Sequence, residues 1–193
     1  MKTASTSQGV GRPRSMASRQ AILDAALQHT LKHGFASLTV EGLSKEARVG
    51  KPTIYRWWPS KGAIVLDALM QYAAQALPLP EGLSLSVRLE NYLQTLFHTL
   101  NGDIGKILKS LMGEAQHDPT FATLFRSQFI AVRRQPVLTL LREGKEQGEL
   151  ATDSNIDVLA DLIYGAMWYR LLVQHAPLDD QFAREIVRAV LEK

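Results

Sequence analysis

Residues 38–61 read LTVEGLSKEARVGKPTIYRWWPSK, and this stretch encodes two short helices separated by a three-residue turn. Thr39 is a favourable N-cap, because its hydroxyl can accept a hydrogen bond from a first-turn amide, and it predicts a helix over about 40–47. After a break at residues 48–50, a second helix is predicted to begin at Lys51, and Pro52 is tolerated in a first turn that needs no amide donor. Pro59 ends this helix. Two short helices at this spacing are typical of a helix-turn-helix motif.

The second helix of the motif has one apolar face and one polar face. Ile54 and Trp58 are four residues apart, so they are predicted to point inward and to join Leu43 and Ala47 of the first helix. The side chains left facing outward are those of Lys51, Pro52, Thr53, Tyr55, Arg56 and Trp57. A solvated amphipathic helix would show the same periodicity, but an outward tryptophan is unusual there unless a partner covers it.

The outward side chains are of the types that contact base edges in the major groove of DNA. Lys51 and Arg56 can donate hydrogen bonds to guanine O6 and N7. Pro52 and the methyl group of Thr53 can contact the methyl groups of thymine. The motif therefore predicts double-stranded DNA as a partner, read by the second helix.

Phosphate contacts are predicted from side chains around this helix. Tyr55 and Lys61 can bond to phosphates, which fixes the register on DNA without reading its sequence. Thr39 and the free amides behind it suit a phosphate as well. Arg12 and Arg14 flank a proline in the N-terminal arm, and they form either a strip for a narrow minor groove or part of a solubilising tail.

Charge is unevenly distributed along the chain, whose 193 residues carry +3 in total. Residues 1–62 contain ten Lys and Arg against three Asp and Glu, a net charge of +7, and the remainder stands at −4. A basic first third favours a polyanionic partner for that part of the chain, although basic tails also occur on proteins that bind no nucleic acid.

Helical periodicity continues through the rest of the chain, and no segment alternates as a strand would, so the predicted fold class is all-α. A disordered basic arm over residues 1–15 precedes a helix-turn-helix DNA-binding domain over 16–62 and a regulatory and dimerisation domain over 63–193. A helix over 60–77 is predicted to connect the two domains. Further helices are predicted near residues 16–33, 84–101, 103–116, 119–142, 155–175 and 179–192.

Residues 16–70 resemble the N-terminal part of the TetR family of bacterial transcriptional regulators. Besides the motif quoted above, the resemblance rests on the helix that ends in Gly34-Phe35 and on the signature Thr53-Ile54-Tyr55 with Pro59-Ser60-Lys61. It implies a three-helix DNA-binding domain, a C-terminal helical ligand-binding domain and a homodimer. By position it implies DNA contacts at Lys51, Pro52, Thr53, Tyr55, Arg56 and Trp57, with a phosphate contact at Lys61.

The function implied by this resemblance is that of a homodimeric repressor, which binds a palindromic operator and is released by a small-molecule effector. Two positions depart from the family pattern. Arg48 stands where glycine is usual in the turn, so it must accept a positive φ or reshape the turn. Gly50 stands where serine is frequent, so the second helix lacks a side-chain acceptor at its N-cap.

Aromatic, methionine and histidine side chains beyond residue 63 are candidates for an effector pocket, although protein cores use the same residue types. The candidates are Tyr92, Phe97, His98, Met112, His117, Phe121, Phe125 and Trp168. The helix predicted over 155–175 is apolar on more than one face, which suits either a dimer contact or an ordinary buried helix. Candidates for a dimer interface are Tyr164, Gly165, Trp168, Leu172, Phe182, Ile186 and Val190.

Several classes of site are disfavoured. The chain has no cysteine, which excludes thiol catalysis and Cys-ligated zinc. His29 and His33 are four residues apart, but no third ligand accompanies them, so a solvated helix face is expected and no metal or cofactor is predicted. No catalytic constellation is visible, so an enzyme is not expected.

No membrane helix is predicted, because no apolar run reaches the roughly 18–20 residues that a span needs. The N-terminus does not resemble a secretory leader, and a cytoplasmic location is expected. The alternative function is that of a small all-α sensor or enzyme whose N-terminal domain docks protein in place of DNA.

Overall fold

The computed structural model describes residues 16–72 and 82–191, and within these ranges every regular element is helical. The prediction of an all-α fold is confirmed. The predicted arm over 1–15, with Arg12 and Arg14, and the last part of the helix predicted over 60–77 lie outside the described residues.

Most elements follow the predicted ranges closely, but the helix predicted to end at Pro59 ends at Tyr55, and the helical stretch predicted over 119–142 continues to Glu146. In the N-terminal part they are α1 (Met16–His33), η1 (Phe35–Ser37), α2 (Val40–Glu46), α3 (Lys51–Tyr55) and α4 (Lys61–Tyr72). In the C-terminal part they are α5 (Leu85–Asn101), α6 (Asp103–His117), α7 (Pro119–Phe125), η2 (Arg126–Ile130), α8 (Ala131–Glu146), α9 (Ile156–Val173) and α10 (Asp180–Leu191). The single helix predicted over 119–142 is divided by η2, which is a π-helical segment.

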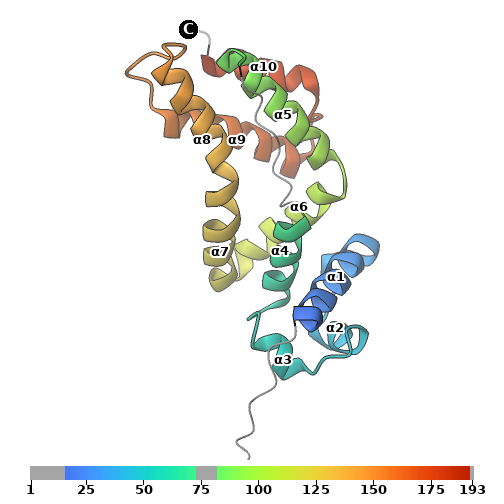
Figure 1. Ribbon diagram of the computed structural model, residues 1–193. Helices are drawn as coiled ribbons and strands as arrows, with labels where there is room; N and C mark the ends of the chain where they lie inside the picture. Colours follow the sequence, from blue (N-terminus) through green and yellow to red (C-terminus); the bar gives the residue numbers. More distant parts are fainter. Residues whose placement is uncertain (1–15, 73–81, 192–193) are drawn as a thin grey trace, which may run out of the picture.

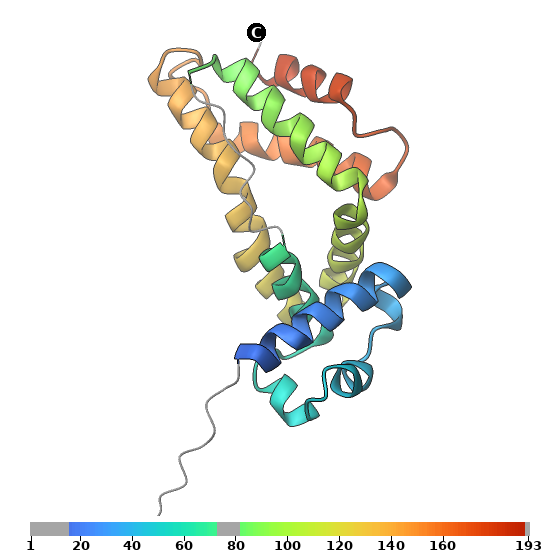
Figure 2. The ribbon, with the colours of Figure 1, turned by 45° about the vertical axis from the view of Figure 1, so that its right-hand side comes forward.

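The helices separate into two groups along the length of the molecule. Figure 1 shows α1, α2 and α3 at one end and α5, α9 and α10 at the other, with α4, α6 and α7 between them. Helix α10 packs along α5, and Figure 2 shows the two running side by side. Buried apolar side chains form one core that extends from α1 to α10.

The turn of the helix-turn-helix motif forms as its residue types require. Thr39 caps α2, since its Oγ1 accepts a hydrogen bond from the Gly42 amide at 3.0 Å. Arg48 has a φ of 54°, so it takes the left-handed conformation that a non-glycine residue rarely adopts. The Ser44 hydroxyl donates to the Val49 carbonyl at 2.6 Å and closes the turn. No side chain caps α3 at Gly50, as predicted.

Burial of one face fixes the orientation of α3. Ile54 is fully buried and Trp58 is 5% exposed, and both pack with Leu43 of α2, as predicted. The Trp58 indole N–H donates to Asp67 Oδ2 on α4 at 2.7 Å. Arg19 of α1 pairs with the same carboxylate oxygen. Asp67 therefore joins α1, the end of α3 and α4 at one point.

Close helix contacts shape the C-terminal part. Gly62 at the start of α4 lies against the ring of Phe121 on α7, where a Cβ would come within 3.1 Å of ring carbons. Arg88 of α5, which is 7% exposed, pairs with Glu143 of α8 at 2.6 Å. At the corner between α5 and α6, a Cβ on Gly105 would overlap the backbone carbonyl of Leu100.

Substitution of Gly105 by alanine is expected to destabilise the protein by about 2 kcal/mol or more, because the backbone of α5 must move to admit a methyl group. The control is Gly113→Ala on the same helix, where an added Cβ meets nothing and alanine improves helix propensity by up to about 1 kcal/mol. Urea unfolding followed by circular dichroism measures both. Equal midpoints for the two variants would contradict the tight corner.

Substitution of Asp67 by alanine is expected to cost about 1–3 kcal/mol, because it leaves the Trp58 N–H without its acceptor and Arg19 without its partner. Asp24→Ala on the exposed side of α1 is the control, with a change within about 0.5 kcal/mol. Thermal unfolding gives the stability and tryptophan emission reports the surroundings of Trp58. An unchanged stability and spectrum in Asp67→Ala would show that the carboxylate does not hold α3.

Candidate DNA-binding surface and ligand cavity

The outward face of α3 lies at the end of the molecule, away from the C-terminal helices (Figure 1). Lys51, Pro52 and Arg56 are exposed, and Tyr55 is 53% exposed despite its large apolar ring. Thr53 is half-buried beside them. The five side chains therefore share one solvent-facing surface, as the spacing predicts.

Lys51 has a partner on the neighbouring helix. Its ammonium group pairs with the carboxylate of Glu41, which lies in the first turn of α2. The hydrogen bond from Lys51 lowers the pKa of the Glu41 carboxyl, with its positive charge as a further cause, so this group stays ionised. A base or phosphate that binds Lys51 must compete with Glu41, a residue that the sequence reading did not single out.

Trp57 is only partly turned outward. It is half-buried and packs against the core, with its ring centre 6.0 Å from that of Trp58. The guanidinium of Arg19 lies 5.8 Å from the Trp57 ring centre. The cost of exposing an indole is thus reduced by contacts within the protein, because α1 and Trp58 cover part of the ring.

Lys61 and Thr39 lie at the N-terminal ends of α4 and α2. The Lys61 ammonium lies 3.4 Å from the Phe35 carbonyl oxygen, 3.5 Å from that of Ala36 and 4.6 Å from the centre of the Phe35 ring. The Thr39 oxygen accepts from the α2 backbone, and its hydroxyl keeps a proton to donate. Both side chains are polar donors at the N-terminal ends of helices.

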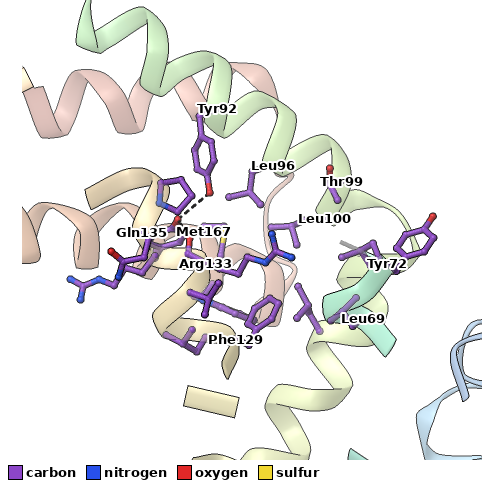
Figure 3. A pocket seen from close by; sticks show the side chains of 18 of the residues that line it. Leu69, Tyr72, Tyr92, Leu96, Thr99, Leu100, Phe129, Arg133, Gln135 and Met167 are labelled. Carbon is purple, nitrogen blue, oxygen red and sulfur yellow. Dashed lines mark hydrogen bonds between the residues drawn. The ribbon is translucent and has the colours of Figure 1, made fainter. Parts of the chain in front are cut away.

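A cavity of about 690 Å³ lies in the C-terminal part, enclosed by α4, α5, α6, η2, α8 and α9. Its volume is in the range of sites for small organic ligands. Most of its wall is apolar, and Figure 3 shows side chains from these elements facing a common space. The apolar lining includes Leu69, Leu96, Leu100, Phe129, Met167 and Trp168.

A chain of hydrogen bonds crosses one side of the cavity. The Tyr164 hydroxyl donates to the Arg133 carbonyl at 2.6 Å, and it lies 3.2 Å from the Tyr92 hydroxyl (Figure 3). Burial raises the pKa of both tyrosines, so both hydroxyls stay protonated at neutral pH. Pro136 lies inside α8 and has no amide to donate, so the helix cannot form its full set of hydrogen bonds near this carbonyl.

The sequence candidates for the pocket are distributed over three environments. Tyr92 and Trp168 line the cavity. Phe97, Phe121 and Phe125 are buried core side chains outside its lining. Exposed positions are occupied by His98 and His117, and Met112 is half-buried against the core, none of them in the cavity wall.

Several lining residues escaped the sequence reading. Phe129 and Arg133 lie at and just after the π-helical segment, which shifts the faces of the helix. Pro136 within a helical stretch was the available signal, since an internal proline marks a distortion that frees backbone carbonyls. Tyr164, considered for a dimer interface, lines the cavity.

The remaining candidates for a dimer interface also lie in different environments. Gly165 and Leu172 are exposed on α9, whereas Ile186 is buried and Val190 half-buried. Phe182 stacks on Phe97, with ring centres 5.7 Å apart. The guanidinium carbon of Arg170 lies over the Phe182 ring, 3.3 Å from its centre. The apolar side chains that α9 exposes are Val158, Leu162, Tyr169, Leu172 and Val173.

No cluster of three or more potential metal ligands occurs in residues 16–72 and 82–191. The rings of His29 and His33 lie 5.0 Å apart, and His29 contacts the Ser37 hydroxyl at 3.1 Å. Of the helices described, none is both long and apolar enough to cross a membrane.

Two parts of the chain match known families of regulators. Residues 22–68 match the bacterial regulatory proteins of the tetR family, and residues 79–190 match the tetracyclin repressor-like C-terminal domain. Among solved structures, the TetR family transcription regulator SCO0332 has a TM-score of 0.78 and 34% identity, with 91% of this chain and 97% of that chain covered. FadR from Bacillus subtilis in complex with stearoyl-CoA has a TM-score of 0.70 at 16% identity, with 90% and 97% covered, which is a likeness of fold.

The curated proteins of similar sequence are also helix-turn-helix-type transcriptional regulators. UidR of Escherichia coli (strain K12), a helix-turn-helix-type transcriptional regulator, is 24% identical over 158 residues, which cover 77% of this chain and 79% of that protein. YdeS of Bacillus subtilis (strain 168), an uncharacterised regulator of the same type, is 36% identical over 177 residues, which cover 92% of this chain and 89% of YdeS. With this identity and with family matches over both parts of the sequence, the chain belongs to the TetR family of helix-turn-helix transcriptional regulators.

Proposed function

We propose that the protein is a homodimeric repressor, which binds a palindromic operator through α3 and leaves it when a small molecule fills the C-terminal cavity. The observation that carries this proposal is the double role of α4. Its first residue, Lys61, lies near the Phe35 and Ala36 carbonyl oxygens of the N-terminal unit, and Leu69 near its end lines the cavity. One helix therefore contacts both the surface for DNA and the space for an effector.

Packing gives α4 a way to transmit a shift. Asp67 ties α4 to Trp58 behind the recognition surface, and Gly62 lies directly against Phe121 of α7. A ligand that displaces Leu69, which is fully buried, is expected to shift α4, because a packed helix moves as a rigid element. The ligand acts only if it binds the shifted arrangement more tightly than the DNA-binding one.

A dimer makes such a shift decisive. Two recognition helices on a palindrome must match half-sites about 34–36 Å apart, or a multiple of that repeat, so a small change in their separation removes the register. The exposed apolar stripe of α9 supports self-association, because five large side chains on one helix face solvent in the single chain. Gly165 lies within this helix and would permit close approach of a second copy.

Base-reading and phosphate-binding side chains are distinguished by their effects on specificity. Arg56→Ala is expected to relax base preference at one position of each half-site, at a cost of about 1–3 kcal/mol. Lys61→Ala is expected to weaken binding to all sequences equally and to reduce the salt slope by about one. Arg142→Ala, on the exposed side of α8, is the matched control.

These affinities can be measured by gel shift, with palindromes from the region upstream of the protein's own gene and scrambled duplexes over a range of salt. A change of base preference alone in Lys61→Ala would contradict its assignment to phosphate. Failure of the unmodified protein to bind any duplex at low salt would favour the alternative in which the N-terminal domain docks a protein.

Substitution of Leu162 by glutamate is expected to convert the dimer to a monomer, because it places a charge in the middle of the apolar stripe on α9, where Leu162 is 57% exposed. Val87→Glu on α5 is the control, since Val87 is 42% exposed but lies outside this stripe. Light scattering after size exclusion gives the mass of each variant. A dimer that persists in Leu162→Glu would exclude this face as the interface.

A further inference from the structure

A carboxylate stands on the outward surface of a helix-turn-helix motif that is otherwise basic. Residues 38–61 contain five Lys and Arg and two Glu, and one of these two, Glu41, pairs with Lys51 at the start of α3. A negative charge at this place repels the phosphates of DNA, so it weakens any binding that depends on charge alone. The position of Glu41 therefore calls for a role other than attraction to a polyanion.

The Lys51–Glu41 pair adds little to the stability of the fold. The side chain of Lys51 is 47% exposed and that of Glu41 is 58% exposed, so water and salt screen the attraction between them. Leu43 of α2 and Ile54 of α3 already join the two helices in the buried core. The function of the pair is therefore sought on the side that faces outward.

The pair bridges the two helices of the motif where α3 begins. Figure 1 shows α2 and α3 together at one end of the molecule, and the two helices are in contact. Glu41 lies in the first turn of α2, whose start is fixed by the Thr39 cap, and Lys51 is the first residue of α3. A cationic donor and an anionic acceptor thus lie side by side at the N-terminal end of α3, which is the part of a recognition helix that contacts base edges.

Both groups keep hydrogen-bonding capacity for a partner. The Lys51 ammonium has more N–H donors than the single one that Glu41 engages. The Glu41 carboxylate accepts from Lys51 and makes a hydrogen bond with the backbone of residue 41, and a carboxylate has further lone pairs beyond these. The pair can therefore offer a donor and an acceptor to DNA while its own hydrogen bond stays intact.

Competition for Lys51 differs between the groups that DNA presents. A phosphate that takes the ammonium brings a second negative charge close to Glu41, and it offers the carboxylate no donor. A G·C base pair presents the acceptors O6 and N7 on guanine and, beside them, the amino donor N4 on cytosine. Adenine in place of guanine turns an amino group toward Lys51 where O6 would be. The G·C pair is thus the one that satisfies both charged side chains.

We propose that Glu41 is a specificity-determining residue, which together with Lys51 reads one G·C base pair of the operator and disfavours contacts with phosphates alone. Lys51 donates to guanine, and Glu41 accepts from the N4 amino group of cytosine. The inference rests on the proposed function, since it takes DNA as the partner of α3, and it adds which base pair this end of the helix selects.

The test uses the full-length protein with duplexes of randomised sequence, from which the bound molecules are selected and sequenced. Lys51→Ala identifies the position that Lys51 reads, because base preference is lost there. Glu41→Ala is the test variant. Glu46→Ala is the matched control, since Glu46 is exposed at the opposite end of the same helix and its substitution removes the same charge.

Affinities follow from fluorescence anisotropy over a range of salt, with the selected duplex, a version in which the G·C pair is exchanged for A·T, and a scrambled duplex. The unmodified protein is expected to prefer G·C at this position by about fivefold or more. Glu41→Ala is expected to lose most of that preference, at the same position as Lys51→Ala. It should also bind the scrambled duplex at least about threefold more tightly, with a salt slope steeper by about one, because Lys51 is then available to a phosphate.

The control and the double variant separate a paired role from a change of net charge. Glu46→Ala should keep the G·C preference of the unmodified protein. The double variant Glu41→Ala with Lys51→Ala should be no less specific than Lys51→Ala alone, because the two side chains act on one base pair. Thermal unfolding of each variant is expected to give an unchanged midpoint, since all the substituted side chains are exposed.

A G·C preference that survives in Glu41→Ala, an equal loss in Glu46→Ala, or a preference for another base pair at the Lys51 position would overturn the inference. So would a Lys51→Ala variant with unchanged base preference. Each of these outcomes leaves DNA binding by α3 standing. Failure of the unmodified protein to bind any duplex at low salt would instead remove the proposed function, and this inference with it.

Discussion

The hydrogen bond from the Trp58 indole to Asp67 is the constraint on which the recognition surface depends. Helix α3 has only five residues, far fewer than an isolated helix needs in water. Its direction is therefore set by what it buries, and Ile54 and Trp58 seat it against α2 and α4. Since Arg19 of α1 meets the same carboxylate, α1 and the segment that follows α3 are both tied to α4 at Asp67. The outward direction of Lys51, Tyr55 and Arg56 follows from that seating.

Helix α4 gives this unit a second neighbour. Gly62 brings the start of α4 against Phe121, and Leu69 and Tyr72 near its end contribute to the cavity wall. The absence of a Cβ at Gly62 matters here, because a larger side chain would separate α4 from α7. The cavity wall and the end of the molecule that carries α3 are therefore in contact with the same helix.

Two irregularities in the helix that follows α7 lie at the wall of the cavity. The π-helical segment over Arg126–Ile130 and Pro136 within α8 both interrupt the regular pattern of backbone hydrogen bonds. The Arg133 carbonyl accepts the Tyr164 hydroxyl between these two features. The hydroxyl groups of Tyr92 and Tyr164 therefore offer hydrogen-bonding groups in the wall of a mostly apolar cavity, with no buried ion pair among its described lining residues.

Most of the local structure could be predicted from the amino-acid sequence. The Thr39 cap, the glycine after α1, the proline in the first turn of α3 and the four-residue spacing of Ile54 and Trp58 act within one or two helical turns, so their consequences could be predicted. For Arg48 the family resemblance left two possibilities, a positive φ or a reshaped turn, and the structure shows the positive φ. Most helix boundaries beyond residue 82 were also predictable, apart from the π-helical segment within 119–142 and the end of α8, which continues to Glu146.

The packing of the helices against one another sets which aromatic side chains are core and which face the cavity. Phe97, Phe121 and Phe125 are of the same residue type as the lining residue Phe129 and also lie on helices. They differ from it in the helices that pack on them. Tyr164 and Trp168 lie on an apolar helix whose faces look alike in the sequence. Contacts such as Lys51 with Glu41 and Trp58 with Asp67 join different helices, and the angle at which those helices meet is not a property of either one alone.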